Sequence, residues 1–226
     1  MCPFCYIGKR RFEKALEHFE FKGDIEVEWK SFQLNPHMET DPEKSINEYL
    51  AGIKGWTVDY ARKVNDQVTS MAKEEGLIYN FDTAVVANSF DAHRLVQLAK
   101  TQKKGDAAEE ALFHAYFTEG KNIADHSTLQ AIGSSIGLDA VEVSEVLKSD
   151  KFSNEVAIDV YHAQKLGARG VPFFVLNGKY GVTGAQATEV FGAALQKSYQ
   201  DWKTNKPVEQ VTNIQGETCS TDGDCA

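Results

Sequence analysis

The spacing of apolar residues divides the chain into a strand-forming start, a long helical middle and a strand-forming end. Over residues 25–29, apolar residues alternate with charged ones, which predicts a strand with one buried face. The alternation shifts by one position at Phe32, and a β-bulge near Lys30 would produce that shift. We therefore expect a bulged strand that ends at the turn signal Asn35-Pro36.

The middle of the chain has the spacing of amphipathic helices. Apolar residues recur there every three or four positions, and glycines or capping residues stand at the breaks between the repeats. The pattern continues from Pro42 to Gly167 without a strand-like segment. One predicted helix ends near Gly76, a second covers 84–100 and a third ends at Gly120. Two short helices follow: the first starts at Asp125, and Gly137 separates it from the second. The last predicted helix covers 152–166.

The pattern changes again at Gly170. Residues 171–176 form an apolar strand run, and Asn177-Gly178 is a strong signal for a two-residue hairpin turn. Residues 179–183 give the returning strand, and a helix follows through Leu195. The end of the chain therefore predicts a ββα unit.

The order of these elements predicts an α/β fold. A strand before Cys2 would complete a βαβ unit that joins the ββα unit, and together they make the thioredoxin topology. Roughly eight to ten residues, one strand and a turn, are expected upstream of the given chain. We predict a thioredoxin-like domain from 1–41 and 168–204, with 42–167 as an inserted all-helical domain.

The first residues carry the most specific chemistry. Cys2-Pro3-Phe4-Cys5 opens a helix, with Cys2 expected at the N-cap and Pro3 at the first helical position. Backbone N–H groups and the helix dipole there favour a thiolate. Cys5 is expected one turn further on and deeper, so Cys2 would attack a disulfide and Cys5 would resolve it. The alternatives are a zinc-binding pair and two inert thiols.

The last segment, 205–226, is polar and without periodicity, which predicts a flexible tail. It holds a second pair, Cys219 and Cys225. A flexible stretch of about 16 residues spans roughly 20–24 Å, so the pair could reach Cys2 and act as a redox relay. Acidic neighbours disfavour tail thiolates, which favours attack by Cys2 on a tail disulfide. The alternative is a tail without a role.

Composition excludes several classes of protein. The formal net charge of −9 argues against a nucleic-acid partner, since phosphate binding requires clustered Lys and Arg. No apolar run approaches the roughly 20 residues that span a bilayer, and no signal-peptide pattern precedes Cys2. These features predict a cytoplasmic protein with no membrane partner. The C-x5-C spacing of the tail pair suits a four-cysteine zinc site poorly, so no metal is expected.

Four segments carry a resemblance to a known family. The chain resembles the DsbA-like thioredoxin superfamily, most closely its cytoplasmic FrnE-like branch, which is related to 2-hydroxychromene-2-carboxylate isomerase and kappa-class glutathione transferases. The similarity covers nearly the whole chain, and the first and last segments together are specific. The segments are Cys2–Arg10, Asn88–Arg94, Ala115–Ile123 and Gly170–Val175.

The resemblance implies a protein disulfide oxidoreductase or isomerase. Val171-Pro172 would be a cis peptide that faces the CxxC and offers a backbone edge to the substrate. The isomerase and transferase relatives usually carry serine where this chain has Cys2, so the retained pair favours disulfide chemistry. Cys2 and Cys5 are then the catalytic residues. The expected substrate-binding residues are Val171, Pro172, Phe4 and Tyr6.

Alternatives to this function stay open. The first is a glutathione-dependent isomerase or transferase of a small aromatic compound, and the second is a redox-switched binding protein. No cofactor is expected beyond glutathione as a co-substrate. The expected partners are protein thiols and disulfides or a small thiol reductant, and a homodimer is left open. His93 lies on an apolar helix, where packing is expected rather than catalysis.

Overall fold

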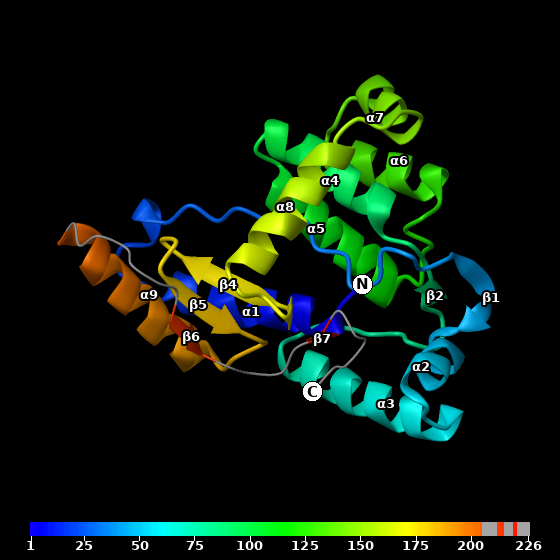
Figure 1. Cartoon of the computed structure of the whole chain (residues 1–226), viewed down its shortest axis with the longest axis horizontal. Coiled ribbons are helices and arrows are strands. Elements are labelled where there is room, and N and C mark those ends of the chain that lie inside the picture. The colour runs from blue at the N-terminus through cyan, green and yellow to red at the C-terminus, as the bar shows by residue number, and fades with distance from the viewer. Residues whose placement is uncertain (205–211, 215–218, 221–226) are drawn as a thin grey trace. The chain divides into compact units, whose positions relative to one another are not determined.

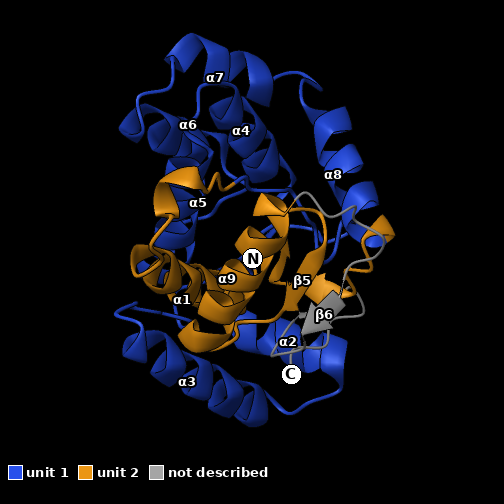
Figure 2. Ribbon diagram, turned by 90° about the vertical axis from the view of Figure 1, so that its left-hand side faces the viewer, with its two compact units in different colours: residues 1, 28–164 blue, residues 2–27, 165–226 orange. Residues whose placement is uncertain are grey.

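The computed structural model describes residues 1–204, 212–214 and 219–220 of the 226-residue chain (Figure 1). The chain divides into two compact units, coloured separately in Figure 2. One unit contains Glu28–Gln164 together with Met1. The other combines Cys2–Val27 with the described residues from Lys165 onward, so it is built from both ends of the chain.

In the unit built from the chain ends, two long helices pack against each other and against a small sheet. Its helices are α1 (Pro3–Glu17), η1 (Lys22–Asp24) and α9 (Thr188–Lys203). Its strands are β3 (Gly170–Val171), β4 (Phe173–Leu176), β5 (Tyr180–Thr183), β6 (Thr212–Ile214) and β7 (Cys219–Ser220). The strand order is β4-β5-β6 in one sheet, while β3 pairs with β7 in a second.

The predicted hairpin is confirmed. β4 and β5 pair antiparallel, with Phe173 opposite Thr183 and Leu176 opposite Tyr180. The turn residues Asn177 and Gly178 have φ angles of 50° and 65°. Two successive positive φ angles match the twist of the flanking strands, and asparagine and glycine adopt them at the lowest cost.

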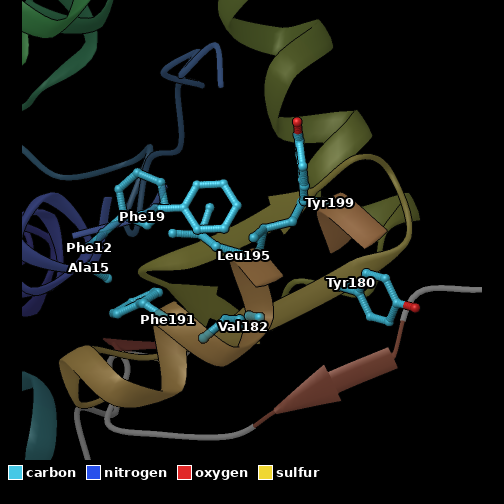
Figure 3. Close-up of a cluster of buried hydrophobic side chains, with 10 residues drawn as sticks. Phe12, Ala15, Phe19, Tyr180, Val182, Phe191, Leu195 and Tyr199 are labelled. Carbon is cyan, nitrogen blue, oxygen red and sulfur yellow. The ribbon is translucent and has the colours of Figure 1, made fainter. Parts of the chain in front are cut away.

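An aromatic core holds α1 and α9 to this hairpin (Figure 3). The Phe12 ring of α1 lies 5.5 Å from the Phe174 ring of β4, centroid to centroid, and 5.7 Å from the Phe191 ring of α9. Val182 of β5 and Phe191 have no exposed surface. Burial of each such side chain contributes roughly 2–3 kcal/mol, so this core fixes where the N-terminus of α1 lies against the strands.

The other unit is mainly helical. Asp125 caps α6 by accepting a hydrogen bond from the Thr128 N–H, which confirms the helix start predicted there. Gly76, at φ 78°, follows the end of α3 as predicted. The helices are α2 (Ile46–Lys54), α3 (Val58–Glu74), α4 (Phe90–Thr101), α5 (Gly105–Phe113), the π-helical η2 (His114–Thr118), α6 (His126–Ser135), α7 (Ala140–Leu147) and α8 (Ser153–Lys165).

The predicted bulged strand over residues 25–34 is wrong, because that segment forms no strand. Ile25 packs against the aromatic core, whereas Val27 is 45% exposed. Further along, the Ser31 N–H donates to the buried Asp159 carboxylate at 2.9 Å. A side chain therefore accepts the hydrogen bond that a neighbouring strand would accept in a sheet. An alternating pattern produces extended backbone, but a strand also needs a backbone partner.

The middle of the chain also contains two strands that the helical prediction did not include. β1 (Asp41–Ser45) pairs antiparallel with β2 (Val85–Val86), with an irregular register. As a result α4 starts at Phe90 rather than near residue 84. β1 is mostly exposed and lacks apolar alternation, so its sequence carries no strand signal without its distant partner.

The tail prediction requires a similar correction at two places. Residues 212–214 and 219–220 form β6 and β7, although the sequence there shows no strand periodicity. β6 pairs in parallel with β5, and β7 pairs antiparallel with β3. Both strands therefore depend on pairing partners that lie far away in the sequence. Cys225 and the rest of 205–226 lie outside the described residues.

Candidate active site

The CxxC segment begins helix α1 as the sequence predicts. Cys2 is the N-cap residue, with φ −93° and ψ 121°, and Pro3 occupies the first turn, where its missing N–H costs no helical hydrogen bond. The Cys5 N–H donates to the Cys2 carbonyl at 3.2 Å. Cys2 and Cys5 are both thiols in this structure.

The aromatic core brings Cys2 to a proline that is distant in the sequence. The Val171–Pro172 peptide bond is cis, and the Cys2 thiol donates to the Val171 carbonyl at a sulfur–oxygen distance of 3.5 Å. The Pro172 carbonyl in turn accepts from the Gly184 N–H at 2.8 Å. The CxxC and the cis-proline strand therefore form one site within one compact unit.

A glycine on α1 allows this close approach. A Cβ atom on Gly8 would lie 3.2 Å from Cγ of Pro172 and 3.4 Å from Cζ of Phe174. Both distances are at or inside ordinary van der Waals contact, so the helix backbone packs directly against the proline and β4. A side chain at this position would require α1 or Pro172 to shift by a few tenths of an ångström.

The hydrogen bonds at the helix start favour the thiolate of Cys2. Burial alone raises the pKa of the Cys2 thiol, but hydrogen bonds from the Cys5 side chain and from the backbone at Cys5 and Phe4 lower it. The net shift of the Cys2 pKa is downward. A lowered pKa increases the thiolate fraction at neutral pH, and the thiolate is the reactive form.

The order of exposure of the two thiols differs from the prediction. Cys2 is 4% exposed, while Cys5 is partly exposed, so Cys5 is not the deeper residue. The physical reason is the position of Cys2 at the N-cap, where its sulfur contacts the carbonyl of β3. A helix-position argument places the two sulfurs along α1 but cannot say which one a strand covers.

Phe4 and Tyr6, predicted to bind substrate, are both buried, with 6% and 2% of their surface exposed. The Arg10 guanidinium carbon lies 4.9 Å from the centroid of the Tyr6 ring, and Arg10 also donates to the Tyr6 hydroxyl at 3.3 Å. Packing therefore occupies both rings in this structure. An exposed apolar surface at Phe4 is not present.

The basic cluster after the dithiol contains a buried lysine, although a basic cluster is usually solvated. Lys9 is only 3% exposed and forms an ion pair with Glu13, one helical turn further on. It lies four residues after Cys5, on the same side of α1. Arg11 donates to the Ala185 carbonyl at 2.6 Å. The four-residue spacing of Lys9 and Glu13 is the sequence feature that indicates this ion pair within the helix.

The tail strand lies at the same site. β7 pairs with β3 so that Cys219 lies opposite Val171 and Ser220 opposite Gly170. Val171 is the residue whose carbonyl accepts from Cys2. The backbone of one tail cysteine is therefore placed across from the strand that contacts the catalytic candidate, while its predicted partner Cys225 lies outside the described residues.

His93 belongs to the helical unit, and its surroundings match the expectation of a packed residue. Burial lowers the pKa of His93 to about 4, and a hydrogen bond with the Phe32 backbone opposes that shift only in part. The neutral imidazole is therefore the folded form at neutral pH. A group that stays neutral in the folded protein but binds a proton when unfolded makes stability depend on pH.

Replacing His93 with glutamine is expected to weaken the acid sensitivity of the protein. The unfolded chain binds a proton near pH 6.5 and the folded chain only near pH 4, so stability is retained at high pH and lost as the pH falls between these values. The loss amounts to at most about 3 kcal/mol. Urea unfolding from pH 7 to pH 4 measures it. His37→Gln, at an exposed turn, is the control. Parallel pH curves for wild type and His93→Gln would contradict the expectation.

Within residues 1–204, no group of three His, Cys, Asp or Glu side chains is placed to hold a metal ion. Over the same residues, no helix is both long enough and apolar enough to cross a bilayer.

The fold and the site define a class of protein. A helix that starts at a CxxC, a cis-proline strand beside it and a hairpin with a final helix behind it make a DsbA-like thioredoxin fold. The chain belongs to the DSBA-like thioredoxin domain family, whose family model matches residues 1–196.

Individual relatives agree with this assignment. A crystal structure of a probable DsbA oxidoreductase from Streptomyces coelicolor has 36% identity and a TM-score of 0.84, covering 100% of this chain and 94% of that one. The Bacillus subtilis protein YwbO, described as uncharacterized, is 29% identical over 86% of this chain and 91% of its own length. A 2-hydroxychromene-2-carboxylate isomerase has 14% identity and a TM-score of 0.63, covering 91% and 95%, and shows the shared fold alone.

Proposed function

We propose that the protein is a thiol-disulfide oxidoreductase or isomerase that acts on protein disulfides through Cys2 and Cys5. The observation that carries the proposal is the contact between the Cys2 sulfur and the Val171 carbonyl, beside the cis peptide bond. It combines a thiol of lowered pKa with a strand that can hold a polypeptide. The chemistry requires no bound cofactor.

The reaction proposed is thiol-disulfide exchange. The Cys2 thiolate attacks one sulfur of a client disulfide, forms a mixed disulfide and releases the other client sulfur as a thiolate. The Cys5 thiolate then attacks the Cys2 sulfur, which closes the Cys2–Cys5 disulfide and releases the second client thiol. Two electrons pass to the client. The reverse sequence oxidises a client dithiol, and the reduction potential of the pair decides the direction.

A polypeptide is the substrate class that the strand edge favours. β3 is an extended segment whose backbone can pair with another strand, and its pairing with β7 supports that capacity. Backbone pairing supplies affinity without requiring a particular side chain on the client. Val171 and Pro172 would hold the client strand while its disulfide meets Cys2.

The test compares substrates of two classes. Reduction of insulin disulfides and repair of scrambled ribonuclease are measured for the wild-type chain beside Cys2→Ser, together with glutathione-dependent conversion of a small aromatic substrate. Polypeptide turnover that disappears in Cys2→Ser supports the proposal. Turnover of the aromatic substrate alone, or activity that survives in Cys2→Ser, contradicts it.

We further propose that Cys219 and Cys225 relay electrons to or from the active site. The pairing of Cys219 with Val171 supports this, because it places the tail backbone at the strand that contacts Cys2. Cys2 would attack a Cys219–Cys225 disulfide, and Cys5 would then resolve the mixed disulfide. This leaves the active-site pair oxidised and the tail pair reduced.

Replacing both tail cysteines with serine is expected to slow multiple turnover several-fold while a single turnover stays unchanged. The reason is that only reoxidation of the active-site pair needs the tail disulfide. Rapid-mixing kinetics with a labelled dithiol peptide separate the two phases, and Ser220→Ala is the control because it keeps both sulfurs. Equal steady-state rates for wild type and the double variant, with every oxidant tested, would reject the relay.

A further inference from the structure

The strand edge beside the catalytic candidate is occupied by the chain itself. Among the described residues, β3 pairs only with β7, and the pairing is antiparallel. Directly opposite residues in an antiparallel pair lie about 4.5–5.5 Å apart between Cα atoms. The backbone of Cys219 is therefore in the place that a client strand would occupy opposite Val171.

The position of β6 brings the tail back to this edge. β6 pairs in parallel with β5, with Tyr180 opposite Thr212 and Val182 opposite Ile214. Only residues 215–218 separate this anchored strand from β7. A short tether gives the tethered segment an effective concentration in the millimolar range. A client peptide at micromolar concentration is therefore at a disadvantage when it competes with β7 for the edge of β3.

The exposure of Cys2 is consistent with a covered site. The thiol that would attack the client is 4% exposed, although an attacking sulfur must be reached by the client disulfide. The Val171 carbonyl contacts this sulfur from the strand that β7 pairs with. The pairing of β7 and the pairing of a client strand would therefore use the same backbone atoms of β3.

We propose that Cys219–Ser220 is an intrachain strand that occupies the client-binding edge of β3 and must leave before a polypeptide client can pair there. The inference rests on the proposed function and adds a control of access to that site. It is separate from the relay, because occupancy depends on the backbone of the tail strand, whereas the relay depends on its sulfur atoms.

The test separates backbone from sulfur in the full-length chain. Ser220→Pro keeps both tail cysteines but removes a backbone N–H and fixes φ near −65°, which disfavours the strand. Ser220→Ala keeps the strand backbone and is the matched control. The Cys219→Ser, Cys225→Ser double variant keeps the strand and removes the sulfurs.

The readout is the binding of a fluorescent client peptide whose cysteines are replaced by serine, measured by anisotropy, so that no turnover is needed. Ser220→Pro is expected to bind the peptide about five- to tenfold more tightly, the effect of about two released backbone hydrogen bonds. The Ser220→Ala and double-serine variants are expected to bind it as the wild type does.

A second measurement keeps the inference testable if the proline has other effects. A synthetic peptide with the sequence of residues 212–226, its cysteines replaced by serine, is expected to displace the client peptide from Ser220→Pro. Equal client affinity for wild type and Ser220→Pro would overturn the inference, as would tighter binding by the double-serine variant. Loss of the proposed function would instead appear as turnover that survives in Cys2→Ser.

Discussion

Replacing Cys2 with serine is expected to reduce the turnover of polypeptide disulfides by on the order of a thousandfold or more. A serine hydroxyl is neither ionised at neutral pH nor able to form a disulfide, so the first covalent step is lost. The fold should be retained, because serine is nearly isosteric and is a favourable N-cap residue for α1. Insulin reduction and urea unfolding of the same preparation measure both outcomes.

The matched variant is Cys5→Ser, which removes the second step and keeps the first. Cys2 should still attack the client, and the mixed disulfide should accumulate as a covalent adduct that mass spectrometry detects. The rate of Cys2 alkylation in this variant should have its midpoint at a higher pH than in the wild type, because the Cys5 side chain helps to lower the Cys2 pKa. Turnover by the Cys2→Ser variant at the rate of the wild type would exclude the dithiol mechanism.

Replacing Gly120 with alanine is expected to destabilise the helical unit by about 2–5 kcal/mol. Gly120 has φ 66°, a conformation that costs other residues about 1–2 kcal/mol. An added Cβ would also lie 2.4 Å from Oγ1 and 2.8 Å from the carbonyl oxygen of Thr83. Overpacking of this kind adds about 1–3 kcal/mol. Urea unfolding measures the free-energy difference.

Gly55 offers a control with the same backbone conformation and free space. Its φ is also 66°, but a Cβ there meets no heavy atom within 4 Å. Gly55→Ala should therefore lose only the backbone contribution. In a Thr83→Ala background, Gly120→Ala should recover part of its loss, since the overlap with Oγ1 is removed while the overlaps with Cβ of residue 83, at 2.6 Å, and with its carbonyl remain. Equal losses for Gly55→Ala and Gly120→Ala would show that the contact with Thr83 contributes nothing.

Elements whose signals are local were predicted well from the sequence. The hairpin at Asn177-Gly178, the start of α6 at Asp125 and the placement of Pro3 in the first turn of α1 each depend on a few neighbouring residues. Such signals act through backbone conformation and short hydrogen bonds, which are the same in any fold. They defined the fold class before any long-range contact was known.

Elements that depend on distant partners were predicted poorly. Residues 25–34 have a strand pattern, yet Ser31 bonds to the Asp159 side chain instead of to a strand. β1 and β7 have no strand pattern, yet each pairs with residues far away in the sequence. A strand is stabilised by its neighbour, so its existence is a property of two segments rather than of one.

The candidate site shows the same division. Residue types and their spacing identified the CxxC and its position at a helix start, and the family resemblance implied the proline that would face it. Tertiary structure decided that Cys2 is the more buried thiol, that its sulfur contacts the Val171 carbonyl and that the tail backbone pairs at the same strand. The reason is physical: local sequence sets the conformation of each segment, whereas burial and backbone pairing arise only when the aromatic core has brought the segments together.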